Sequence, residues 1–97
     1  MQYDYKDILN AAIEKYGRDS QMDMMIEEMS ELTKALIKYR RSGYHHALLR
    51  EIHEEMADVR IMFDQMKIIF GATDGEEARK TRRLAERLGM GSEKRGG

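Results

Sequence analysis

Two acidic segments, IEEMSEL at residues 26–32 and EEMADV at residues 54–59, decide the fold expected for this chain of 97 residues. Each segment carries two carboxylates three residues apart, namely Glu28 with Glu31 and Glu55 with Asp58. On an α-helix, residues at this spacing lie on the same side, about 60° apart. Two such helices folded back on each other would bring four carboxylates together, and these repel one another unless a cation lies among them. Because Mg²⁺ and Mn²⁺ prefer oxygen ligands, the two segments predict a divalent metal site.

The spacing of apolar residues around these segments predicts four α-helices. The expected ranges are residues 4–16, about 20–39, about 45–70 and about 76–88. Glycines at positions 17, 43 and 71 separate them, where a helix ends or the chain turns. The sequence therefore predicts one all-α domain over residues 1–88 with a central antiparallel hairpin made of the second and third helices. A disordered C-terminal tail is expected at residues 89–97.

Polar residues near the expected helix starts resemble N-caps. Ser20 followed by Asp23 is similar to a capping box, and Asp19 is an alternative cap for the same helix. Asp74 can cap the last helix, which is acidic at its start and basic after it. The first helix packs against the hairpin, and the last helix either completes a bundle or crosses to a partner chain.

Each hairpin helix carries an apolar stripe that is expected to face the core. The stripe of the second helix is Met22, Met25, Ile26, Met29, Leu32, Leu36 and Tyr39, and that of the third is Leu48, Ile52, Met56, Val59, Met62, Phe63, Met66, Ile69 and Phe70. Glu55 falls inside the second of these arcs, with Asp58 at its edge. A carboxylate that faces the core is costly unless it is paired, protonated or coordinated. The reverse side of the third helix carries Ala57, Ile61 and Ile68, which suggests an oligomer.

Composition narrows the function classes. The net charge of −1 argues against a general electrostatic attraction to nucleic acid or membrane. The absence of cysteine excludes disulfides, thiolate metal sites and thiol nucleophiles. No apolar run approaches the roughly 20 residues of a membrane span, and the N-terminal residues do not resemble a secretion signal. We expect a soluble, cytoplasmic protein with no membrane partner. The basic residues of the last helix are the best argument for a nucleic-acid partner, but they have no interleaved aromatic residues and form no recognised module, so a nucleic-acid partner is not expected.

Several readings stay open for the remaining polar residues. Acidic pairs on a helix are often a solvated surface. Glu27 and Glu54 can be further metal ligands or support the ligands, but their positions on the helices favour solvent or salt bridges. Lys34, Lys38 and Arg41 follow the first acidic pair and can hold phosphates. Adjacent residues of a helix point in different directions, so His45 and His46 are not expected to share a metal ion.

The two acidic motifs resemble the signature of the MazG-like nucleoside triphosphate pyrophosphohydrolases, which is EExxE followed across a helical hairpin by ExxD. The motif residues are Glu27, Glu28, Glu31, Glu55 and Asp58. Over residues 16–88 the chain is similar to the small phage and bacterial members, including the segments QMDMMIEEMSELTKALIKYRR, EIHEEMADVRIMFDQMKIIFG and KTRRLAERL.

This resemblance implies a four-helix bundle and a dimer or tetramer. It also implies Mg²⁺, with Mn²⁺ as an alternative, held by Glu28, Glu31, Glu55 and Asp58. The implied reaction hydrolyses a nucleoside triphosphate to its monophosphate and pyrophosphate, with a modest preference for deoxy forms. Either Glu31 or Glu27 can serve as the catalytic base, and the sequence does not choose between them. A nucleotide-binding or protein-interaction module without turnover on the same scaffold is the alternative.

Overall fold

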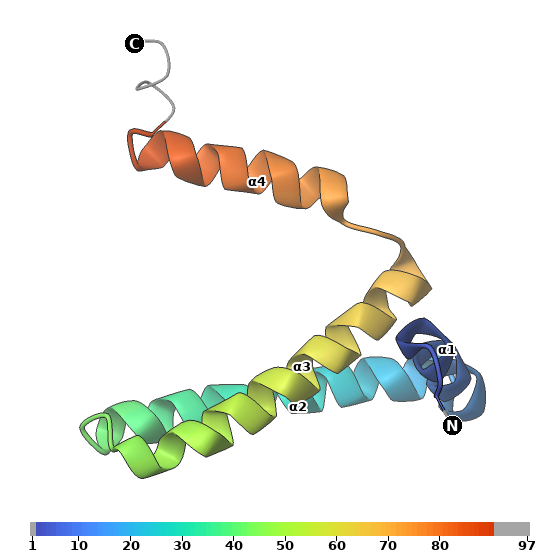
Figure 1. The fold of residues 1–97 in the computed structure, drawn as a ribbon, viewed down its shortest axis with the longest axis horizontal. Coiled ribbons are helices and arrows are strands. Elements are labelled where there is room, and N and C mark those ends of the chain that lie inside the picture. Colours follow the sequence, from blue (N-terminus) through green and yellow to red (C-terminus); the bar gives the residue numbers. More distant parts are fainter. Residues whose placement is uncertain (1, 91–97) are drawn as a thin grey trace.

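Helices α2 and α3 form an antiparallel hairpin, and α1 packs against both of them in the computed structural model, which describes residues 2–90 (Figure 1). The elements are α1 (Tyr5–Tyr16), α2 (Arg18–Arg41), the short 3-10 helix η1 (His46–Leu48), α3 (Leu49–Phe70) and α4 (Asp74–Arg87). Residues 2–90 contain no strand, so the predicted all-α class and central hairpin are confirmed. Within this range no helix is both long and apolar enough to cross a membrane.

Glycines end the helices where the sequence predicts, but the predicted N-caps are wrong. Gly17, with φ of 90°, ends α1, and its carbonyl accepts a hydrogen bond of 3.1 Å from the backbone N–H of Gln21. Because Gly17 itself opens the hydrogen-bond ladder of α2, Asp19 and Ser20 lie inside that helix. Asp74 is likewise the first residue of α4 and not its cap.

The core is thin and partly polar. Its buried apolar residues are Leu9 of α1, Ala35 of α2, and Ile52 and Met62 of α3. Two glutamines are also buried, and Gln21 Nε2 donates to Gln65 Oε1 over 2.7 Å across the α2–α3 contact. This pair satisfies polar atoms that would otherwise be buried without partners, so it favours one alignment of α2 on α3.

A second polar contact joins the first helix to the third. The Tyr5 hydroxyl donates to Asp64 Oδ2 over 2.7 Å, and Arg60 Nε donates to the same carboxylate. The Tyr5 hydrogen bond is the main cause that lowers the pKa of Asp64, with Arg60 and Lys67 adding to it. Asp64 therefore stays charged and anchors the start of α1 on α3.

The predicted apolar stripes of the two hairpin helices are confirmed in part. Most of their residues are buried or half-buried, including Met22, Met25, Leu32 and Tyr39 of α2. Ile26, Met29 and Leu36 of the same stripe are 61%, 45% and 45% exposed, and Met56, Phe63 and Phe70 of the α3 stripe are exposed as well.

The inward side of α2 also includes residues outside the predicted stripe, because Gln21 and Ala35 are buried and Glu28 is half-buried. The exposed residues of the two stripes are therefore left as a second apolar surface.

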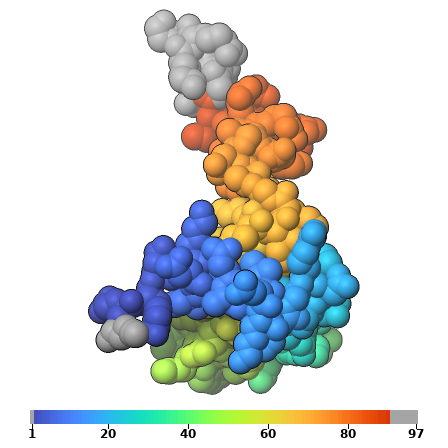
Figure 2. Space-filling model, turned by 90° about the vertical axis from the view of Figure 1, so that its right-hand side faces the viewer, coloured from blue at the N-terminus to red at the C-terminus, as the bar shows by residue number. Residues whose placement is uncertain are grey.

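Helix α4 leads away from the hairpin after Gly71 and does not pack along α1, α2 or α3 (Figures 1 and 2). Its apolar edge is open to solvent, with Leu84 and Leu88 52% and 65% exposed. The single chain therefore does not form the predicted four-helix bundle. Of the predicted disordered tail, residues 91–97 lie outside the described part of the chain.

The buried glutamine pair generates a stability prediction. Gln65→Leu leaves the amide of Gln21 buried without its partner, which should lower the free energy of unfolding by about 1–3 kcal/mol. Replacing both glutamines by leucine removes both polar groups and should recover most of that loss. Urea denaturation measures both values, with Gln2→Leu at an exposed position as the control. A double variant as unstable as Gln65→Leu would contradict the pairing.

Candidate metal centre

Three carboxylates from two helices converge at the middle of the hairpin. Glu28 of α2 and Glu55 and Asp58 of α3 each offer an oxygen atom, and these atoms all lie within 4.8 Å of one another. Glu28 and Glu55 are half-buried and Asp58 is exposed, so the cluster is covered on one side and open to solvent on the other. The antiparallel hairpin thus brings Glu28 of the first predicted acidic pair to both residues of the second pair.

Glu55 is the residue that distinguishes this cluster from an ordinary acidic surface. Its Oε1 atom is buried and has no hydrogen-bond partner within residues 2–90. A buried carboxylate oxygen without a partner is strongly unfavourable in a folded protein, and such atoms are usually hydrogen-bonded or coordinated to a cation. The predicted inward position of Glu55 is confirmed. A divalent cation fits the site because it would bind this oxygen and neutralise its neighbours.

The electrostatics agree with the geometry. Burial, followed by the charges of Asp58 and Glu31, raises the pKa of Glu55 above its usual range. Burial, followed by the charges of Asp58 and Glu55, raises the pKa of Glu28. Both carboxylates therefore take up a proton or a cation more readily than a free glutamate side chain does.

The other motif carboxylates lie at the rim. Glu31 is outside the group of three, and its Oε2 atom lies 3.7 Å from Lys34 Nζ. Its charge nevertheless raises the pKa of both Glu28 and Glu55, so it is a close neighbour of the cluster. Glu27 is exposed, and its charge raises the pKa of Glu28. The structure brings together three of the four predicted metal ligands and places the fourth beside them.

The predicted phosphate-binding cations lie at increasing distances from the cluster. Lys34 is adjacent through its contact with Glu31, and Lys38 Nζ lies 3.4 Å from Glu51 Oε2 of α3. Arg41 follows Glu28 by 13 residues, which is about 20 Å along a helix axis, so it is not part of this site. The Lys38–Glu51 bridge was not predicted. The only sequence signal for Glu51 was its position four residues before Glu55, on the same side of a helix.

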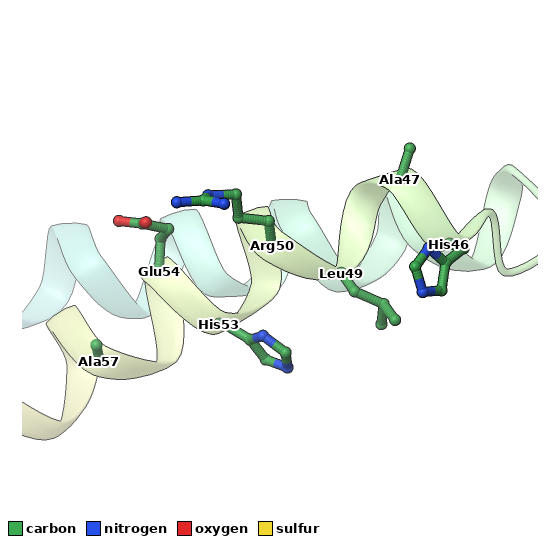
Figure 3. Close-up of a pocket in the computed structure, with 7 residues that line it drawn as sticks. All are labelled: His46, Ala47, Leu49, Arg50, His53, Glu54 and Ala57. Atoms are coloured by element: carbon green, nitrogen blue, oxygen red, sulfur yellow. The ribbon is translucent and has the colours of Figure 1, made fainter.

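The histidines do not add to the metal site. His46 and His53 line a groove of about 650 Å³ on the outer side of the hairpin, together with Leu49, Arg50 and Glu54. Figure 3 shows both rings on the side of Leu49, whereas Arg50 and Glu54 extend from the opposite side. Seven residues, or about 10 Å along the axis, separate the two histidines, which is too far for one metal ion.

Comparison of the chain with protein-family models, with curated proteins and with solved structures gives no match. The site is therefore interpreted from its own geometry and from the motif resemblance.

The raised pKa of Glu55 generates a pH prediction. When the folded-state pKa lies above the unfolded value of about 4.3, the folded state binds more protons between these two values. The free energy of unfolding should therefore fall as the pH rises through that window, and the loss is complete above the folded-state pKa. With divalent cations chelated, Glu55→Gln should be more stable than the wild type at pH 7, and the difference should vanish near pH 4.

Thermal unfolding at several pH values measures this effect. Glu54→Gln is the matched control because it removes the same charge from an exposed neighbouring position. A wild type that is more stable than Glu55→Gln at pH 7 without divalent cations would show that the buried oxygen has a partner.

Proposed function

We propose that this chain is a Mg²⁺-dependent nucleoside triphosphate pyrophosphohydrolase that forms a nucleoside monophosphate and pyrophosphate. The observation that carries the proposal is the buried, unpartnered Oε1 atom of Glu55 beside Glu28 and Asp58. The resemblance of the EExxE and ExxD motifs to the MazG-like family supplies the reaction type. A site that served only to bind an anion would gain nothing from clustered carboxylates.

Different residues of this chain would hold the cation, contact the phosphates and accept a proton. Glu28, Glu55 and Asp58 would hold the cation, with Glu31 as a further ligand. When bound, Mg²⁺ neutralises charge on a triphosphate and lowers the pKa of a water molecule. The Lys34 ammonium, now beside Glu31, is the nearest predicted phosphate contact. A phosphate that attracts Lys34 away frees the Glu31 carboxylate to accept a proton from the attacking water, and Glu27 is the alternative base.

Specificity is expected to be broad. Met24 and Met25 precede Glu28 by about one turn of α2, so they lie on the same side of that helix. Met25 is half-buried, and methionine side chains adapt to ligands of different shape. Apolar contacts of this kind distinguish ligands by only about 1–3 kcal/mol. We therefore propose activity on several nucleoside triphosphates, with a modest preference for the deoxy forms taken from the family resemblance.

A second copy of the chain is proposed to cover the apolar flank, defined here as Ile26, Met29 and Leu36 of α2 with Met56 and Phe63 of α3. All five residues are exposed. The contact between Lys38 and Glu51, and the effect of Glu31 on Glu55, place the carboxylates on the other side of the hairpin. Within the flank, Ile26, Met29 and Leu36 are separated by three and seven residues, the spacing of a helical seam. A dimer through this flank would leave both metal sites open.

The enzymatic proposal predicts a selective loss of activity. Glu55→Gln should lower kcat/KM for nucleoside triphosphates by about 10²–10³-fold, the usual effect of losing one preorganised electrostatic group. Glu54→Gln, with the same change of charge next to it, should stay within severalfold of the wild type. In ¹⁸O-labelled water, the label should enter the monophosphate, because water attacks the α-phosphorus. Recovery of every nucleotide intact, with one of them retained, would favour the non-catalytic binding module.

The dimer proposal predicts which surface matters. Met29→Glu combined with Met56→Glu places charges in the apolar flank and should convert a dimer to a monomer in sedimentation equilibrium. Ile61→Glu is the matched control, because Ile61 is 41% exposed on the outer side of α3 that the sequence suggested as a contact. Dissociation by Ile61→Glu alone would assign the interface to that outer side instead.

A further inference from the structure

The tip of the α2–α3 hairpin carries a groove that the proposed enzymatic function does not use. Ile37, Arg40, Arg41 and Tyr44 line it, and its volume is about 310 Å³. We propose that this tip groove binds single-stranded nucleic acid, with the two arginines on the phosphates and the Tyr44 ring against a base. The proposal is independent of the carboxylate site, because Arg41 lies about 20 Å from Glu28 along α2.

The charge of the tip is the first observation. Residues 38–50 contain Lys38, Arg40, Arg41 and Arg50 but no aspartate or glutamate, although the whole chain is slightly acidic. Lys38 is neutralised by Glu51, whereas no ion pair within residues 2–90 involves Arg40 or Arg41. Two free guanidinium groups on one groove are suited to phosphate, which they bind through paired hydrogen bonds.

The exposed aromatic ring is the second observation. Tyr44 is 64% exposed, and its ring meets Tyr39 edge to face, with centroids 5.5 Å apart and planes at 68°. This contact holds the ring in place while most of it stays open to solvent. Stacking of bases on such rings, next to a cationic groove, is the usual way in which proteins bind single strands. An acidic peptide would use the arginines but would have no use for the ring.

The backbone of the turn fixes these side chains in position. Tyr44 has a φ of 67°, which is uncommon for a residue other than glycine, and its N–H donates to the Tyr39 carbonyl over 3.0 Å. The Ser42 hydroxyl donates to the same carbonyl over 2.7 Å and accepts from the His45 N–H over 2.9 Å. A turn held in this way loses little conformational entropy on binding, and backbone strain of this kind gathers at functional sites.

Helix α4 offers a comparison within the same chain. Lys80, Arg83 and Arg87 line a smaller hollow of about 190 Å³, which has a similar charge but no aromatic side chain. A ligand attracted by charge alone would use both surfaces, whereas a ligand that needs a stacking ring would use the tip. This difference selects a single strand over a duplex, whose bases are already stacked on one another.

The test is fluorescence anisotropy with labelled oligo(dT) and oligo(U) of about 16 nucleotides, near the upper limit of known site sizes. Both polymers are titrated with the full chain in the presence of EDTA, so that no nucleotide chemistry takes place. Arg40→Ala combined with Arg41→Ala should raise the Kd at least tenfold and reduce the slope of log K against log salt by about 1.4. Arg83→Ala combined with Arg87→Ala removes the same charge and should change the Kd less than twofold.

Variants of Tyr44 separate stacking from charge. Tyr44→Asn should raise the Kd by roughly 5-fold to 150-fold, since a stacked base contributes about 1–3 kcal/mol and asparagine tolerates a positive φ. Tyr44→Phe keeps the ring and should bind like the wild type. Circular dichroism confirms the helical content of each variant.

Three results with nucleic acids would overturn the proposal. These are no binding of either polymer by the wild type, equal losses from the tip and α4 double variants, or equal affinity for a duplex of the same length. Complete displacement of the oligonucleotide by polyglutamate at matched charge would also overturn it in favour of an acidic protein partner. Tighter binding of one polymer than of the other would support it and identify the natural ligand as DNA or RNA.

Discussion

The contact between α2 and α3 is constrained by charge as much as by hydrophobic burial. Glu28, Glu55 and Asp58 each have an oxygen within 4.8 Å of the others, and one oxygen of Glu55 has no hydrogen-bond partner within residues 2–90. Only four apolar side chains of the described residues are buried, so the core provides a modest force against this repulsion. The hydrogen bonds of Gln21 with Gln65 and of Tyr5 with Asp64 lie towards the α1 end of the hairpin, away from its tip. Such a cluster opposes the packing around it unless a proton or a cation relieves the repulsion.

The hairpin carries surfaces of different chemistry at different places. One side carries the carboxylates and the ion pairs of Lys34 and Lys38, and the other carries exposed Met and Phe side chains. The tip adds free arginines and an exposed tyrosine. Because α2 and α3 are continuous helices of 24 and 22 residues, these surfaces keep fixed distances from one another. Changes on one surface need not disturb another.

Much of the fold could be predicted from the sequence because its signals are local. Gly17, Gly43 and Gly71 mark helix ends through their own backbone freedom, and Glu55 was placed inward by the apolar residues around it. The orientation of α2 could be predicted only in part, since the predicted stripe also included Ile26 and Met29, which are exposed. Which stripe meets α3 depends on partners far along the chain, such as Gln65 for Gln21. The open position of α4 could not be predicted for the same reason. An amphipathic pattern shows that a helix has a face to bury, but it does not identify the neighbour that covers this face.

The hairpin topology also bears on how the chain folds. The described packing joins α1, α2 and α3, which follow one another through short connections, so little loop-closure entropy opposes it and folding is expected to be fast. Closing the hairpin is the step that brings Glu28 to Glu55 and Asp58. Their repulsion therefore opposes the closed hairpin relative to the open chain. A divalent cation that bound only the closed hairpin would stabilise it by mass action, so the melting temperature of the chain would rise with the concentration of that cation.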